Sequence, residues 1–190
     1  MLRKVAVLLV LTLGWTASAL AQSNELGFVA GGQFSFYPGT DTGTGFVVEG
    51  SYGRRLFHVP TISMFVELPV TAAFDLDSAL PSAFSEGQYS SLFITPGLKL
   101  KFVPELPISP FFTAGFGWAR FRREATATIP EVITNTSVAQ FGAGVDIKIA
   151  PVVGLRFQAR DYFSGELGFN NATEDRQHNL TAMGGLYFRF

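Results

Sequence analysis

Residues 180–190 read LTAMGGLYFRF, and this closing stretch decides the fold. Leu186 and Phe190 fall on one phase of a two-residue repeat, whereas the polar Thr181 and Arg189 fall on the other. A period of two is that of a β-strand, because successive side chains of a strand point to opposite faces. The chain therefore ends in a strand with one apolar face, although chain termini are usually polar and frayed.

The same period recurs in seven earlier segments, which gives eight predicted strands. They are residues 26–36, 45–53, 62–70, 92–102, 111–121, 139–149, 153–163 and 180–190. The connections between them alternate in length. The long, polar ones are residues 37–44, 71–89, 122–136 and 164–177, and the short ones are 55–60, 103–108 and 150–151. This rhythm is typical of an up-and-down barrel whose two rims face different compartments.

The two faces of the predicted strands differ in composition. The chain contains 20 Phe and 20 Gly. Phe gathers on one face, and Gly with isolated charges on the other. A soluble β-sandwich would line its polar face with Ser, Thr, Lys and Glu, whereas glycine in a strand needs a reason. The narrow interior of an eight-stranded barrel supplies that reason. We therefore predict an all-β, eight-stranded antiparallel up-and-down transmembrane β-barrel.

The N-terminus has the three parts of a secretory signal peptide. Arg3 and Lys4 are followed by an apolar run over residues 5–13 and by Ala19-Leu20-Ala21, a cleavage pattern. We expect export through the Sec pathway and removal of residues 1–21. An uncleaved membrane anchor is the alternative, but the apolar run is short for a spanning helix, which needs about 20 residues.

Residues 22–190 form one predicted domain with modest negative charge. The whole chain has 14 basic and 15 acidic residues and no Cys. Removal of Arg3 and Lys4 leaves 12 basic against 15 acidic, a balance that argues against a nucleic-acid surface. The absence of Cys excludes disulfides. No cofactor or metal motif is present.

The C-terminal stretch resembles the signal that the outer-membrane barrel assembly machinery reads on its clients. Gly185, Phe188 and Phe190 carry this resemblance, and Met183 departs from it, since that place is usually polar. Residues 24–190 are similar to the small barrels of the OmpA transmembrane-domain and OmpX type. The resemblance implies a monomer in the bacterial outer membrane, in contact with lipid and lipopolysaccharide. It also implies that the loops would carry any extracellular ligand.

The predicted inner face carries three acids and three bases. They are Glu49, Glu67, Asp146, Lys99, Arg156 and Arg160. An unpaired charge in a dry interior is costly, so we expect one network. OmpA-type barrels close their lumen with such a network, and the resemblance implies a structural plug. A narrow gated pore is the alternative, but an eight-stranded lumen is filled by side chains.

The strand order gives two expectations for this network. Asp146 should lie opposite Arg156 across the turn at residues 150–151. Glu49 should lie opposite Glu67 across the turn near His58. Like charges side by side destabilise a strand pair, so a cation should join the two glutamates, either Lys99 or Arg160.

The function predicted is structural or surface-interacting, without turnover. Some eight-stranded barrels modify lipid A with His and Ser near the outer rim, which makes such an enzyme the remaining alternative. His178 near the outer end of the last strand could pair with Ser164 or Glu166. The match is poor because no Ser follows His178 on its own strand. His58 falls in a predicted periplasmic turn.

Overall fold

A computed structural model describes residues 23–36, 43–75, 89–123, 131–164 and 177–190. The predicted signal peptide and most of the long connections lie outside these residues. The described residues form nine antiparallel β-strands: β1 (Asn24–Phe36), β2 (Gly43–Val59), β3 (Ile62–Asp75), β4 (Tyr89–Ile94), β5 (Gly97–Phe102), β6 (Ile108–Arg123), β7 (Val132–Ala150), β8 (Val153–Ser164) and β9 (Gln177–Arg189). None of the described segments forms a helix long and apolar enough to cross a membrane.

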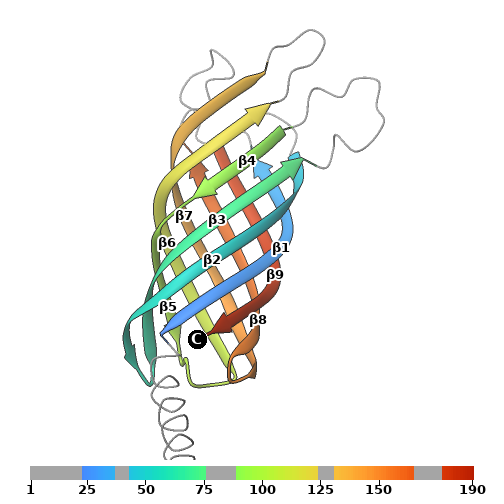
Figure 1. Cartoon of the computed structure of the whole chain (residues 1–190). Helices are drawn as coiled ribbons and strands as arrows, with labels where there is room; N and C mark the ends of the chain where they lie inside the picture. The colour runs from blue at the N-terminus through green and yellow to red at the C-terminus, as the bar shows by residue number, and fades with distance from the viewer. Residues whose placement is uncertain (1–22, 37–42, 76–88, 124–130, 165–176) are drawn as a thin grey trace, which may run out of the picture.

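The strands close into a ring (Figure 1). Strands that follow one another along the chain pair with each other, except that β4 and β5 each pair with β3 and β6 instead, and β1 also pairs with β9. Backbone hydrogen bonds join the two ends of the barrel: Asn24 N donates to Phe190 O at 3.0 Å, and Phe190 N donates to Asn24 O at 3.1 Å. The terminal Phe190 therefore belongs to the hydrogen-bonded wall rather than to a frayed tail.

Strands β4 and β5 are two parts of one strand, interrupted at Thr95 and Pro96. Pro96 has no N–H to donate, so the ladder breaks there. The register nevertheless continues unchanged, because β4 and β5 keep the same offset both to β3 and to β6. The barrel thus has eight strands around its wall, as the sequence predicts.

The two rims differ as expected. Short connections at Pro60–Thr61, residues 103–107 and Pro151–Val152 lie at one rim, named here the turn end, together with both termini of the barrel. The opposite rim, named the loop end, is formed by the strand ends that border residues 37–42, 76–88, 124–130 and 165–176, which lie outside the described residues. The strands are longer than predicted: β2 runs to Val59, where residues 55–60 were predicted as a connection. At the loop end β7 begins at Val132, within another predicted connection.

Side chains alternate between lumen and outer surface as predicted. Phe112, Phe116 and Phe141 point outward and are each more than half exposed, whereas Thr113 faces the lumen. Glycine makes room inside at Gly27, where an added Cβ would lie 2.9 Å from Arg156 Nη1. Gly27 therefore leaves space for a large buried cation, which explains why the lumen face is rich in glycine.

Candidate functional site: the filled lumen

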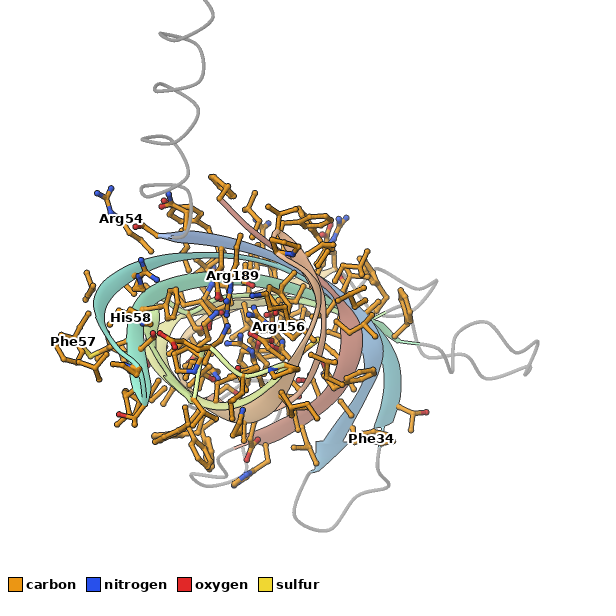
Figure 2. All side chains as sticks on the ribbon, turned by 90° about the horizontal axis from the view of Figure 1, so that it is seen from below. Phe34, Arg54, Phe57, His58, Arg156 and Arg189 are labelled. Atoms are coloured by element: carbon orange, nitrogen blue, oxygen red, sulfur yellow. The ribbon has the colours of Figure 1, made fainter. Side chains whose placement is uncertain are left out.

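Ionisable side chains fill the half of the lumen nearer the turn end. We name this set the charged half: Glu25, Glu49, Glu67, Lys99, Lys101, Asp146, Arg156, Arg160 and Arg189. All except Arg189 are at most 3% exposed. Seen from the turn end, Arg156 and Arg189 lie toward the middle of the ring (Figure 2).

Glu25 of β1 is the acceptor shared by most of the cations. Its Oε2 lies 2.7 Å from Lys99 Nζ and 3.1 Å from Arg156 Nη2. Its Oε1 lies 2.7 Å from Lys101 Nζ and 3.0 Å from Arg189 Nε. One carboxylate therefore holds together cations from three other strands, β5, β8 and β9. These charge-assisted hydrogen bonds offset part of the hydration that the cations lose on burial.

Arg160 of β8 reaches across the lumen and joins two glutamates. Its Nη2 lies 3.1 Å from Glu49 Oε1 and 3.0 Å from Glu67 Oε2. Lys99 Nζ lies 3.2 Å from Glu67 Oε1. The prediction that a cation joins Glu49 to Glu67 is confirmed. Arg160 makes the bridge, and Lys99 contacts only Glu67 of the two.

The prediction that Glu49 lies opposite Glu67 is wrong. Glu49 pairs with Thr71, and Glu67 pairs with Gly53. The error comes from treating residues 55–60 as a connection, whereas the two strands run on to a two-residue turn. The longer hairpin moves the register by four residues in total. A glutamate therefore faces a hydroxyl, and Thr71 Oγ1 donates to Glu49 Oε2 at 3.1 Å.

Asp146 of β7 lies opposite Arg156 of β8, as predicted. Arg156 donates to both carboxylate oxygens, from Nε at 2.8 Å and from Nη2 at 2.9 Å. Such two-pronged pairs are among the strongest ionic contacts in proteins. Lys101 Nζ also contacts Asp146 Oδ2. The pair is thus part of the same network that Glu25 organises.

Sequence reasoning missed three members of the charged half, namely Glu25, Lys101 and Arg189. Glu25 precedes the predicted start of the first strand. It is nevertheless in phase with the inward Gly27, so extending the alternation by one residue would have found it. Lys101 lies two residues after Lys99 on the same face. With these additions the fully buried set has four acids and four bases, so its charges balance.

The other half of the lumen, nearer the loop end, holds two buried apolar clusters, with the neutral polar side chains of Gln33, Ser91, Ser164, Asn179 and Thr181 beside them. We name these two clusters the apolar half: Val29, Val47, Ala73, Phe93, Ala119, Phe121, Val138, Tyr162 and Met183. The rings of Phe93 and Tyr162 stack with centroids 4.4 Å apart, and Phe93 meets Phe121 edge to face at 5.6 Å. Each of these three rings is fully buried. The filling of the lumen therefore changes along its length from ionic side chains to apolar and neutral polar ones.

His178 lies on the outer surface near the loop end, apart from the lumen. Its Nδ1 is 3.1 Å from Asp161 Oδ2. Ser164 points into the lumen and is 1% exposed, so the predicted pairing of His178 with Ser164 is wrong. Glu166 lies outside the described residues. Among the residues that the structure describes, no three His, Cys, Asp or Glu side chains gather closely enough to hold a metal ion.

A profile of the outer membrane protein β-barrel domain matches residues 6–188. The chain belongs to this family. Membership in the family places the chain in the bacterial outer membrane as an integral β-barrel. The turn end then faces the periplasm, because outer-membrane barrels have short periplasmic turns and longer extracellular loops.

Solved members of the small outer-membrane barrels share the fold at low sequence identity. Neisserial surface protein A superposes with a TM-score of 0.64 at 17% identity, covering 88% of this chain and 97% of that one. The attachment invasion locus protein of Yersinia pestis gives 0.53 at 13%, covering 89% and 99%. The outer membrane enzyme PagL gives 0.51 at 13%, covering 86% and 99%. No curated protein sequence matches the chain significantly.

The outer wall of this family member matches the thickness of a bilayer. Along β6 the outward residues run from Ile108 through Phe112 and Phe116 to Trp118, and the next outward residue is Arg120. Ten residues of tilted strand rise about 24 Å, close to the apolar band of such barrels. Trp118 therefore lies at the outer edge of the band, and Arg120 lies at the height of the lipid head groups.

Proposed function

We propose that the chain is a monomeric structural or surface-interaction barrel without turnover. The filled lumen supports this proposal: its buried charges are matched with one another, and an apolar set lies between them and the loop end. Such an interior presents no reactive group to a substrate. Partner specificity then belongs to the loops, which in barrels vary independently of the wall that carries them.

The sequence of the loop segments suggests the charge of a partner. Residues 37–42, 76–88, 124–130 and 165–176 contain seven acidic residues and one basic residue, Arg176. The Yersinia pestis attachment invasion locus protein has also been solved in complex with the heparin analogue sucrose octasulfate, which is a polyanion. A polyanion has the wrong charge for the acidic loops of this chain. We therefore expect an extracellular partner with a basic surface.

Retention of the refolded barrel on surfaces of opposite charge tests this expectation. The purified chain in non-ionic detergent should be retained on immobilised polylysine and not on immobilised heparin at moderate salt. Neutralising Glu166, Glu174 and Asp175 to their amides should reduce retention severalfold, because the attraction is electrostatic. Glu105→Gln, at the opposite rim, is the matched control and should change little. Equal retention of all three proteins, or preference for heparin, would contradict a role for the acidic loops.

Lipid and lipopolysaccharide are the expected partners of the outer wall. Arg120 is exposed just above Trp118, and Arg122 is half-exposed with Glu131 at 2.7 Å. Guanidinium groups at this height suit the phosphates of lipopolysaccharide. Arg120→Gln should lower the amount of lipopolysaccharide that purifies with the barrel. An unchanged amount would remove Arg120 from the contact.

Export through the Sec pathway and insertion by the barrel assembly machinery complete the proposal. Phe188 and Phe190 face outward and are 38% and 46% exposed, and Gly185 faces the backbone of β1. Deletion of Phe190 removes at most about 2 kcal/mol of apolar contact. If the machinery reads this residue, the defect in cells should far exceed the loss measured after refolding in detergent. Equal, small effects in both settings would make Phe190 an ordinary lipid-facing side chain.

A lipid A-modifying enzyme is the alternative that His178 keeps open. His178 contacts Asp161, whereas the predicted chemistry needs a contact between His178 and a serine. Mass spectra of lipid A from cells with and without the chain should therefore be identical. A mass change that is lost in His178→Ala would overturn the absence of turnover.

A further inference from the structure

A partly open cavity of about 210 Å³ lies at the turn end of the lumen. Arg55 of β2, Lys148 of β7 and Arg189 of β9 line it with positive charge. Phe65 forms part of its wall, and the ammonium groups of Lys99 and Lys101 lie 5.0 and 5.5 Å from the Phe65 ring centroid. The cavity is therefore bounded by the charged half and faces the periplasm.

Two β-bulges keep cations at this cavity. The β2–β3 register shifts between Arg55 and Phe57, and the β7–β8 register shifts between Lys148 and Ala150. A bulge inserts an extra residue and redirects the side chains around it. Phe57, just after the first bulge, is 52% exposed and projects outside the ring (Figure 2). Arg55 and Lys148 are thus held at the cavity while their apolar neighbours face outward.

Charge at the cavity is not balanced by the protein. Arg189 is held by Glu25 at 3.0 Å. Within the described residues, Arg55 and Lys148 form no ion pair and no side-chain hydrogen bond. The acid at the cavity, Glu105, is 63% exposed and lies 3.6 Å from His58. Because the acids of the charged half already match its buried bases, the cavity carries an excess of positive charge.

The turn that carries Glu105 is held in a strained conformation. Val103 has a φ of 41°, in the left-handed region that β-branched residues rarely adopt. Its N–H donates to Thr61 O at 2.8 Å, and its carbonyl accepts from Leu106 N at 3.0 Å and from Ser109 Oγ at 3.1 Å. Strain of this kind persists only where surrounding contacts enforce it, and it concentrates at binding sites. The turn is thereby fixed over the cavity.

We propose that this cavity binds a phosphate group presented from the periplasmic side. Two arginines and a lysine from three different strands line it, and guanidinium forks and ammonium point charges are common protein ligands of phosphate oxygens. The same chemistry has two sources at this height: a free phosphate in the periplasm and the head group of an inner-leaflet phospholipid. The site is independent of the loops on which the proposed surface role depends.

Calorimetric titration of the refolded barrel in maltoside detergent tests the proposal, with inorganic phosphate in one arm and a short-chain phosphatidic acid in the other. Binding of inorganic phosphate would assign the site to a free phosphate. Binding of the phosphatidic acid alone would assign it to a lipid head group. Absence of binding in both arms would overturn the proposal.

Variants at adjacent positions separate this site from general electrostatics. Arg55→Gln and Lys148→Gln should each weaken binding by about tenfold or more, as expected for loss of a charged hydrogen-bond donor. Arg54→Gln is the matched control, because Arg54 is exposed and projects outside the ring (Figure 2), and should change the affinity less than about twofold. Glu105→Gln removes the opposing charge and should tighten binding.

Each variant is first shown to be folded by its mobility in cold detergent gels. Equal weakening by Arg54→Gln and Arg55→Gln would mean that the protein attracts anions without a site, and would overturn the proposal. Weaker binding in Glu105→Gln would overturn it as well, since the carboxylate would then be helping to hold the ligand.

Discussion

The charged half and the apolar half of the lumen fill the same narrow barrel by opposite means. In the charged half, four acids and four bases are buried with ionic contacts of 2.7–3.2 Å between most partners. In the apolar half, rings such as Phe93, Phe121 and Tyr162 fill the space mainly by their volume. An ionic filling therefore depends on the match of every charge, whereas an apolar filling depends on volume.

Tyr162 joins the two halves. Its ring stacks on Phe93, and its hydroxyl lies 2.8 Å from Thr71 Oγ1 and 3.4 Å from Glu49 Oε2. A phenol can be buried in this way because its polar tip finds partners while its ring packs against apolar groups. Tyr162 thus contacts ionic or polar groups at its hydroxyl and aromatic groups at its ring, at the boundary between the two halves.

Loss of Glu25 should destabilise the charged half most severely. Glu25→Ala leaves four cations without their shared acceptor, and removing one partner of a buried ion pair already costs about 3–5 kcal/mol. We expect a loss at or above the top of that range, or failure to fold. Urea titration followed by the gel shift between folded and unfolded barrels measures it. Glu105→Ala, which removes an exposed acid, is the control. A loss below about 1 kcal/mol for Glu25→Ala would contradict the central place of this carboxylate.

Loss of Phe93 should destabilise the apolar half, but by a smaller free energy than the loss of Glu25 in the charged half. Phe93→Ala should cost about 3–4 kcal/mol, because the cavity left by the ring cannot be refilled. More conservative substitutions in each half separate the effect of charge from the effect of volume. Phe93→Leu keeps the apolar volume and should cost about 1.5 kcal/mol or less, whereas Glu25→Gln keeps the shape but removes the charge and should remain strongly destabilising. Similar losses in the free energy of unfolding for Phe93→Leu and Glu25→Gln would contradict the distinction between filling by charge and filling by volume.

Coupling between Asp146 and Arg156 tests the charged half at the level of one pair. Arg156→Ala should destabilise the barrel more than Arg156→Ala combined with Asp146→Ala, because the single change leaves the buried Asp146 carboxylate without its two-pronged partner and with Lys101 alone. The coupling free energy from the double-mutant cycle should reach about 1–3 kcal/mol. Simple additivity of the two single losses would show that the pair does not interact.

Alternation alone predicted the faces of the strands, because lipid and a narrow lumen impose a strict period of two. In residues 111–121, Phe112 and Phe116 share one phase of the repeat and Thr113 has the other, and the structure places the two Phe outward and Thr113 inward. Alternation also identified six of the buried charges. Glu25 was missed because a polar residue at a strand start looks like a connection when only apolar residues mark the strand.

The β7–β8 register was predicted correctly at Asp146 and Arg156. The β2–β3 register was not, because it depends on a turn length and a bulge that alternation does not encode. The bulge at Arg55 and the two-residue turn after Val59 together place Glu49 beside Thr71. The apolar half was missed for another reason. Phe93 is in phase with Lys99 on the strand predicted over residues 92–102, which places it on the inner face. The inner face was expected to be polar, however, so the part of Phe93 in closing the lumen was overlooked.

Single-channel recording in planar bilayers tests whether the charged half and the apolar half each close the lumen to ions. The wild-type barrel should give no conductance steps at any applied voltage. Phe93→Ala should give none either, because the charged half still fills the lumen below it. Discrete, reproducible steps from the wild-type protein would contradict the account, since they would require a continuous water path through both the charged half and the apolar half.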